Sequence, residues 1–147
     1  MQVSHVLQAE ASQIYKALLT SIQAQVQASL GQDIRIEDIQ EGLSYQLGNQ
    51  GGTGQKSSAR LTIVSLIPNQ EYSYQVASNR GLITTTFDMK ERTDKTTEVT
   101  YSEEFSSQDF FVRLNHKLLS FLMGSRYRKC ANMLLNNLET YTLEQIQ

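Results

Sequence analysis

The chain has 147 residues, 39% of them hydrophobic, and a formal net charge of −2. This length is typical of one domain with one hydrophobic core, so we expect residues 1–147 to form a single domain. The 13 basic residues are scattered and are balanced by 15 acidic ones, so nucleic acid, whose phosphates require a sustained positive surface, is not an expected partner.

The first thirty residues predict a short strand followed by a helix. Residues 2–8 alternate between two faces, as a strand does. Ser12 is the expected N-cap of the helix, because its hydroxyl can accept from free amides of the first turn. Apolar residues then recur at about every fourth position up to Gly31, which tolerates a left-handed helix stop. The pattern leaves open one helix or two short helices broken near 20–21.

The middle of the chain predicts an antiparallel sheet. Residues 43–47 alternate between apolar and polar side chains and lead into the turn-rich run GNQGGTG at 48–54. Four further strands are expected at 59–66, 71–77, 82–90 and 97–105. The segments between them are short and rich in turn residues, and strands joined in this way are antiparallel neighbours.

Residues 107–141 predict one long helix. They contain no proline, and their apolar side chains keep a spacing of three or four. A helix of about 30 residues is about 45 Å long, which is enough to cross a sheet of this size. Gly124 interrupts the pattern and indicates close backbone approach or a slight bend.

The chain shows no sign of export or membrane insertion. No apolar stretch approaches the roughly 20 residues that span a bilayer, and the N-terminus lacks the features of a signal peptide. Cys130 is the only cysteine, which excludes an intrachain disulfide and a zinc-binding thiol cluster. We expect a cytoplasmic protein, with the Cys130 thiol buried and inert in its apolar helical surroundings.

The order of strand, helix, antiparallel strands and long terminal helix resembles the helix-grip, or START/Bet v 1-like (SRPBCC), superfamily, which includes polyketide cyclases. The resemblance spans essentially the whole chain. It implies an α+β fold in which a curved antiparallel sheet wraps around the C-terminal helix and encloses a hydrophobic ligand cavity. The stretches EGLSYQL (41–47), NQEYSYQV (69–76) and VTYSEEF (99–105) are similar to a group of uncharacterised bacterial proteins from lactic-acid bacteria and streptococci.

Several side chains would face such a cavity. Alternation along the strands places four tyrosines on the apolar side of the sheet: Tyr45, Tyr72, Tyr74 and Tyr101. Each tyrosine supplies a ring for packing and a hydroxyl that needs a partner when buried, which suits ligand contact but also a well-packed core. Three residues of the last helix would supply the apolar wall opposite: Leu118, Phe121 and Leu122.

Glu103 is the one candidate for acid–base chemistry. If Val99 and Phe105 are buried, alternation turns Glu103 toward the cavity, where a carboxylate is costly unless it is paired. Two interpretations stay open, a ligand anchor or general acid, and a strand-edge glutamate that reaches solvent or pairs with a basic residue. A one-residue bulge would turn Glu104 inward instead.

The main interpretation is therefore a protein that binds a small hydrophobic or aromatic molecule. One alternative is a cyclase or dehydratase-type enzyme that uses Glu103 as general acid or base. Another is a protein-interaction module without a ligand, which would use the outer sheet face or the basic cluster at 126–129. Ligand identity and oligomeric state, a homo-oligomer included, are left open.

No metal or cofactor is expected. His5 and His116 are the only histidines, and they lack the spacing of a catalytic metal site. No serine lies in a GxSxG motif, and no phosphate-binding glycine loop follows a predicted strand. Hydrolase, nucleotide-binding and hydride-transfer functions therefore have no support in the sequence.

Overall fold

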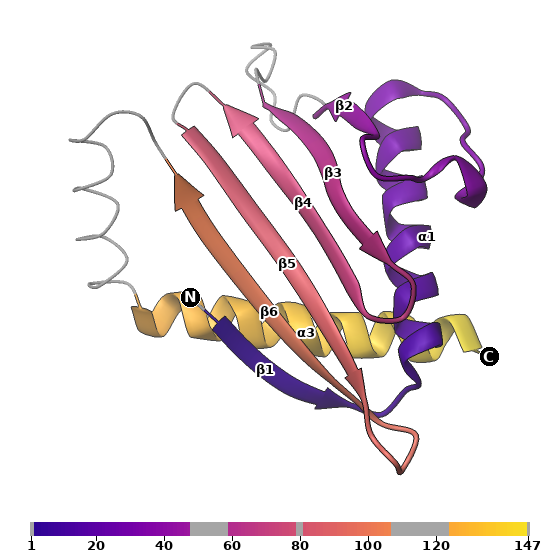
Figure 1. Cartoon of the computed structure of the whole chain (residues 1–147), viewed down its shortest axis with the longest axis vertical. Coiled ribbons are helices and arrows are strands. Elements are labelled where there is room, and N and C mark those ends of the chain that lie inside the picture. Colours follow the sequence, from indigo (N-terminus) through magenta and orange to yellow (C-terminus); the bar gives the residue numbers. More distant parts are fainter. Residues whose placement is uncertain (1, 48–58, 79–80, 107–123, 147) are drawn as a thin grey trace.

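The structure is a computed structural model, and it describes residues 2–47, 59–78, 81–106 and 124–146. The elements in chain order are β1 (Gln2–Leu7), α1 (Ala11–Leu30), a 3-10 turn (Ile36–Asp38), β2 (Ser44–Gln46), β3 (Arg60–Ile67), β4 (Glu71–Ser78), β5 (Gly81–Glu91), β6 (Thr97–Ser106) and α3 (Gly124–Ile146). The six strands form one antiparallel sheet in the order β1-β6-β5-β4-β3-β2 (Figure 1).

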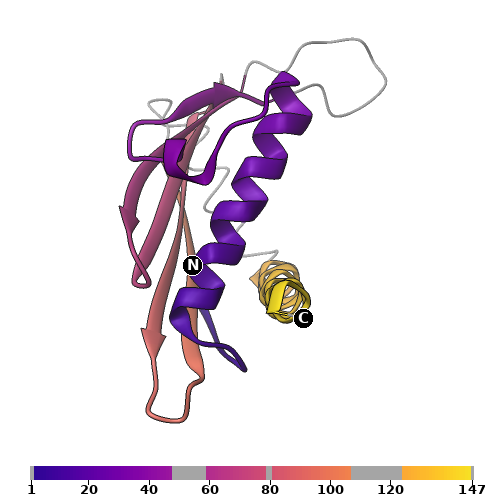
Figure 2. The same cartoon turned by 90° about the vertical axis from the view of Figure 1, so that its right-hand side faces the viewer.

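The described helices lie on the same face of the curved sheet (Figure 2). α1 connects the two edge strands, β1 and β2, and α3 crosses the strands and packs against α1, β1 and β6. We call the face that carries the helices the helix side of the sheet. Neither α1 nor α3, as described, is long and apolar enough to cross a membrane.

The expected strands all form, with two differences. The strand expected at 43–47 is shorter, because only Ser44–Gln46 pairs with β3. In β3 the register shifts between Ile63 and Ser65, so that Ile63 lies opposite Tyr74 while Ser65 lies opposite Ser73. Val64 is the extra residue of this bulge, which bends the strand locally.

α1 is a single continuous helix. Its N-cap is Glu10, so the expectation of Ser12 is wrong by two residues. The reason is a side chain inside the first turn, since Gln13 Oε1 accepts from the Glu10 N–H at 2.9 Å. At the other end Gly31 stops the helix as expected, with a left-handed φ of 67° that costs a glycine little.

The polar pair at 20–21 does not break the helix. The Thr20 hydroxyl donates to the Lys16 carbonyl at 2.9 Å, and the Ser21 hydroxyl donates to the Leu18 carbonyl at 3.0 Å. Both hydroxyls are therefore satisfied within the helix, as serine and threonine often are in helix interiors.

The described part of the last helix begins at Gly124 and continues five residues past the expected end, to Ile146. The expected stretch 107–123 lies outside the described residues. Ala131 and Leu135 face the core, whereas Cys130 is exposed. The expectation of a buried thiol is wrong because residues share a helix face at spacings of three or four, and Cys130 lies one and five positions from the buried Ala131 and Leu135.

α3 is hydrogen-bonded to β1 and to the residue that follows it. His5 Nε2 lies 2.6 Å from Asn132 Oδ1, and the backbone N–H of Gln8 donates to Glu139 Oε2 at 2.7 Å. The core between sheet and helices contains buried side chains from every layer, among them Leu7, Ile14, Ile63, Val99 and Leu135.

Candidate functional site

Four aromatic rings form a continuous row on the helix side of the sheet. We call this set the aromatic row, and its members in spatial order are Tyr74, Tyr72, Phe87 and Tyr101. Successive ring centroids are 5.3, 5.9 and 5.2 Å apart, a separation at which aromatic pairs attract one another. The strand register places Tyr72 opposite Phe87 and Phe87 opposite Tyr101. The row therefore crosses three neighbouring strands, β4, β5 and β6.

Most of the row is buried. Tyr72, Phe87 and Tyr101 are 5%, 5% and 7% exposed, and Tyr74 is half-buried. Phe87 was not among the expected site residues, although alternation along β5 places it on the same face as the buried Thr85 and Met89. The signal was present in the strand pattern, but the sequence did not show which rings meet across strands.

A fourth tyrosine joins two of these rings from the edge of the sheet. Tyr45 in β2 is 2% exposed, and its hydroxyl donates to Gln25 Oε1 of α1 at 2.7 Å. Tyr45, Tyr72 and Tyr74 lie close enough for their ionisations to influence one another. We call these three residues the phenol cluster. The contact with Gln25 joins residues 20 positions apart, and no sequence signal indicates it.

The phenol cluster is electrically neutral. Burial, together with the nearby Tyr74, raises the pKa of Tyr45 to about 12. Burial and the neighbouring phenols also raise the pKa of Tyr72 well above its usual value. For Tyr74 burial raises the pKa, a hydrogen bond with the Thr85 side chain opposes the rise, and the carboxylate of Glu103 adds to it. All three hydroxyls therefore keep their protons at neutral pH.

Glu103 lies beside the aromatic row. It is half-buried and is opposite Thr85 in the register, whereas Glu104 is exposed, so no bulge exchanges the two glutamates. The Tyr101 hydroxyl donates to Glu103 Oε2 at 2.8 Å. The structure thus brings together four strand tyrosines and Glu103 around one face. Three other expected site residues lie outside the described residues: Leu118, Phe121 and Leu122.

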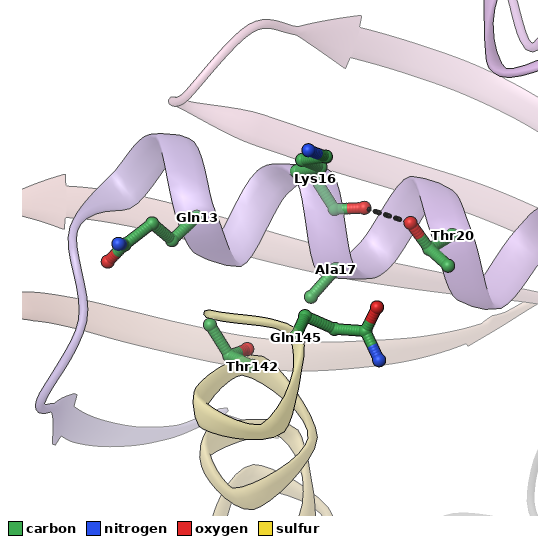
Figure 3. A pocket seen from close by; sticks show the side chains of 6 residues that line it. All are labelled: Gln13, Lys16, Ala17, Thr20, Thr142 and Gln145. Carbon is green, nitrogen blue, oxygen red and sulfur yellow. Dashed lines mark hydrogen bonds between the residues drawn. The ribbon is translucent and has the colours of Figure 1, made fainter. Parts of the chain in front are cut away.

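A hollow of about 250 Å³ lies where α1 crosses α3 (Figure 3). Its lining residues are Gln13, Lys16, Ala17, Thr20, Thr142 and Gln145. The hydroxyls of Thr20 and Thr142 already donate to backbone carbonyls of their own helices. The volume is below the roughly 300 to 1,000 Å³ of typical ligand sites, so this hollow is the weaker candidate.

Another hollow, of about 670 Å³, lies at the turn between β3 and β4 and is lined by several carboxylates. Burial and the neighbouring Glu71 raise the pKa of Asp88 there. Across the described parts of the chain, no three histidine, cysteine, aspartate or glutamate side chains are grouped so that they could hold a metal ion. We take the aromatic row and the phenol cluster, where buried rings and hydroxyls share one face, as the candidate site.

Similar folds occur among solved structures. A protein of unknown function from Staphylococcus aureus, SA2116, aligns with a TM-score of 0.67 and 12% identity over 100% of this chain and 96% of that chain. Ara h 8.0201 aligns with a TM-score of 0.62 and 12% identity, covering 98% and 97% of the two chains. CalU16 from Micromonospora echinospora aligns with a TM-score of 0.55 and 12% identity, covering 95% and 71%.

These likenesses define the class of protein by its fold, which is the Bet v 1-like helix-grip α+β fold. The expected fold class is thereby confirmed. Residues 1–124 match the family described as a domain of unknown function, DUF3284, and the chain belongs to that family. No curated protein matches the sequence.

Proposed function

We propose that this protein binds a small hydrophobic or aromatic molecule between the helix side of the sheet and its C-terminal helix. The observation that carries the proposal is the aromatic row with the phenol cluster at its end. Burying a hydroxyl is costly unless it has a partner, so four tyrosines are more than a core held by apolar packing alone requires. An apolar surface with a few placed polar groups is typical of small-molecule sites.

In this proposal the ring faces contact the apolar part of the ligand, and the hydroxyls contact its few polar atoms. Tyr45, Tyr72 and Tyr74 are the proposed polar contacts at one end of the row, and Tyr101 with Glu103 at the other. The proposed opposite wall consists of residues of the last helix: Leu118, Phe121 and Leu122.

We also propose that residues 1–147 form one domain and that the protein works in the cytoplasm. The exposed free thiol of Cys130 suits a reducing compartment, where thiols stay unpaired. The similarity of 41–47, 69–76 and 99–105 to proteins of lactic-acid bacteria and streptococci stays a prediction.

Native mass spectrometry of the protein purified from its own host tests the binding proposal. We expect a mass above that of the bare chain, which disappears when the protein is denatured. Resonances of Tyr72, Phe87 and Tyr101 should shift when the released molecule is added back to protein labelled on its aromatic rings. A matched control is the hollow between the helices, where Gln13→Ala should leave the retained mass unchanged. The proposal would be contradicted by a native mass equal to that of the chain alone, together with aromatic resonances that do not shift when a small-molecule extract of the host is added.

A second candidate function is an enzyme of the cyclase or dehydratase type. It requires a second polar group within hydrogen-bond reach of the acid–base residue, and the 2.8 Å contact between the Tyr101 hydroxyl and Glu103 Oε2 meets this requirement. Glu103 would act as general acid or base on a bound carbonyl compound.

An interaction module without a ligand is favoured only if a stoichiometric protein partner is recovered with a chain that retains no small molecule.

The enzyme candidate predicts separate effects on turnover and binding. Glu103→Gln removes the ionisable group but keeps its shape, so turnover of the retained compound should fall by at least about 100-fold while the dissociation constant changes by about twofold or less. Chromatography of the compound after incubation measures turnover, and fluorescence of the tyrosines measures binding. Equal turnover by Glu103→Gln and the native protein would exclude this role for Glu103.

A further inference from the structure

The hydroxyl of Tyr72 differs from the other hydroxyls of the phenol cluster. Tyr45 donates to Gln25, and Tyr74 is hydrogen-bonded with Thr85. Tyr72 is 5% exposed, yet within the described part of the chain its hydroxyl has no hydrogen-bond partner, and burial and neighbouring phenols alone account for its raised pKa. A buried polar group without a partner loses the free energy of a hydrogen bond and requires an explanation.

The surroundings of the Tyr72 hydroxyl explain why it has no partner. Among the described side chains, every fully enclosed nitrogen or oxygen atom has a hydrogen-bond partner. The Tyr72 oxygen has no such partner, so it is not fully enclosed and keeps some surface open to a neighbouring group. The ring itself is packed between Tyr74 and Phe87, with centroids at 5.3 and 5.9 Å. The hydroxyl is thus a fixed donor at the edge of an apolar surface.

The charges around the cluster limit what that donor can bind. The carboxylate of Glu103 acts on Tyr74 from the β6 side, and the other described groups that act on these phenols are neutral: the phenols themselves and the side chains of Thr85 and Gln25. Every lysine and arginine whose side chain the structure describes is exposed. A negatively charged group beside Tyr72 would therefore be desolvated within a cluster on which the Glu103 carboxylate already acts, whereas a neutral acceptor oxygen would not meet this repulsion.

We propose that Tyr72 is the hydrogen-bond donor that anchors the ligand, and that the site selects flat, neutral molecules carrying a carbonyl or similar acceptor oxygen over carboxylates of the same shape. This inference rests on the proposed binding function. It adds the chemical class of the ligand and the residue that recognises it.

A matched pair of fluorescent probes tests the selection. One is PRODAN, a neutral dimethylamino-naphthyl ketone, and the other is the corresponding dimethylamino-naphthoic acid, which is a carboxylate at neutral pH. Fluorescence titration of the full chain should give a dissociation constant at least about tenfold lower for the ketone, because the acid must bring a desolvated negative charge close to the Glu103 carboxylate. Equal affinity for both probes would overturn the inference and leave the proposed binding function standing.

The variant Tyr72→Phe removes one oxygen and keeps the ring. It should weaken the ketone about 3- to 10-fold, the usual range for one net hydrogen bond, and shift its bound emission to shorter wavelength. The control Tyr15→Phe alters a half-buried tyrosine of α1 near Glu41 and should change affinity by less than about twofold. Unchanged affinity and emission for Tyr72→Phe would overturn the role of Tyr72.

An infrared measurement tests the hydrogen bond to the ligand directly, without a variant. The infrared carbonyl band of the ketone bound to the native protein should lie at the lower frequency of a hydrogen-bonded carbonyl. A band at its position in dry hydrocarbon would overturn the inference without any variant. If neither naphthyl probe binds the folded protein, the proposed function fails for flat aromatic ligands, and the inference fails with it.

Discussion

The buried phenols make the stability of the protein sensitive to alkali. In an unfolded chain tyrosine loses its proton near pH 10, whereas burial raises the pKa of Tyr45 in the folded protein to about 12. Between these values the unfolded state has released a proton that the folded state still holds, so the free energy of unfolding decreases as the pH rises. The loss approaches about 1.4 kcal/mol per pH unit for each such phenol, and the stability is fully present below about pH 10.

Urea unfolding between about pH 9 and about pH 12, with tyrosinate absorbance recorded in parallel, measures this loss. Tyr45→Phe removes one of the titrating groups, so its free energy of unfolding should fall less steeply over the same range. Lysines titrate identically in both proteins, which makes the difference between the slopes specific to Tyr45. Parallel slopes would show that the phenol is ionised as readily in the folded chain as in the unfolded one.

At the residue scale the sequence predicted which face of a strand a side chain lies on, but not which side chains it contacts in other elements. Alternation placed Tyr45, Tyr72 and Tyr101 on the buried side, because a strand has only two faces. It could not show that the Tyr45 hydroxyl meets Gln25 or that Phe87 completes the row. Those contacts depend on strand register and on the position of α1, which short-range patterns do not specify.

The elements themselves differ in how they carry stability, and α3 offers a direct comparison. Leu135 is fully buried, whereas its neighbour Leu134 is 38% exposed. Leu135→Ala should lower the free energy of unfolding by about 2 to 5 kcal/mol, because it removes buried methyl groups and leaves a cavity. Leu134→Ala makes the same chemical change on an uncovered flank and should cost about 1 kcal/mol or less.

Chemical denaturation of both variants measures this difference, and the helix propensities of the two substitutions cancel. Similar losses for the two leucines would mean that α3 is not held by the stripe that contains Ala131 and Leu135.

The ends of helices and strands were predictable where a single residue or a short local motif determines them. Gly31 ends α1 through a backbone conformation that glycine adopts easily, and this signal lies in one residue. The N-terminus of α1 was missed because Gln13 hydrogen-bonds to Glu10, a pairing that competes with the more common serine cap. β2 is short because its length depends on how much of β3 lies opposite, which is a property of two segments.

The molecule as a whole is closed by contacts between its first strand and its last helix. His5 and Asn132 are 127 positions apart and lie 2.6 Å from each other through Nε2 and Oδ1. A double-mutant cycle with His5→Ala and Asn132→Ala should give a coupling free energy of about 0.5 to 1.5 kcal/mol, as expected for one hydrogen bond.

The matched control replaces His5→Ala by Ser4→Ala, since the exposed hydroxyl of Ser4 contacts Thr100 in β6. Its effect should add to that of Asn132→Ala within about 0.5 kcal/mol. A coupling near zero for His5 and Asn132 would mean that α3 is positioned by its apolar stripe alone.

The fold class was predictable at the scale of the whole molecule because it depends on the order of helices and strands. That order follows from the spacing of apolar residues, which changes along the chain between the period of a strand and that of a helix. The candidate site was predictable only in part. Its tyrosines and Glu103 follow from alternation, whereas the lack of a partner for the Tyr72 hydroxyl among the described residues depends on all the side chains packed around it.

The pairing of β1 with β6 also imposes a delay between the synthesis of β1 and its incorporation into the sheet. Gln2 lies opposite Ser102, so the first strand meets its partner only after about 100 further residues have been made, which takes about 5 to 20 s at the usual rates of translation. During that interval the apolar face of α1, which includes Ile14 and Ile22, waits for most of the sheet that will cover it. β1 is thus made about 100 residues before the strand that pairs with it, and a ribosome that pauses before β6 leaves β1 and α1 open to chaperones and proteases.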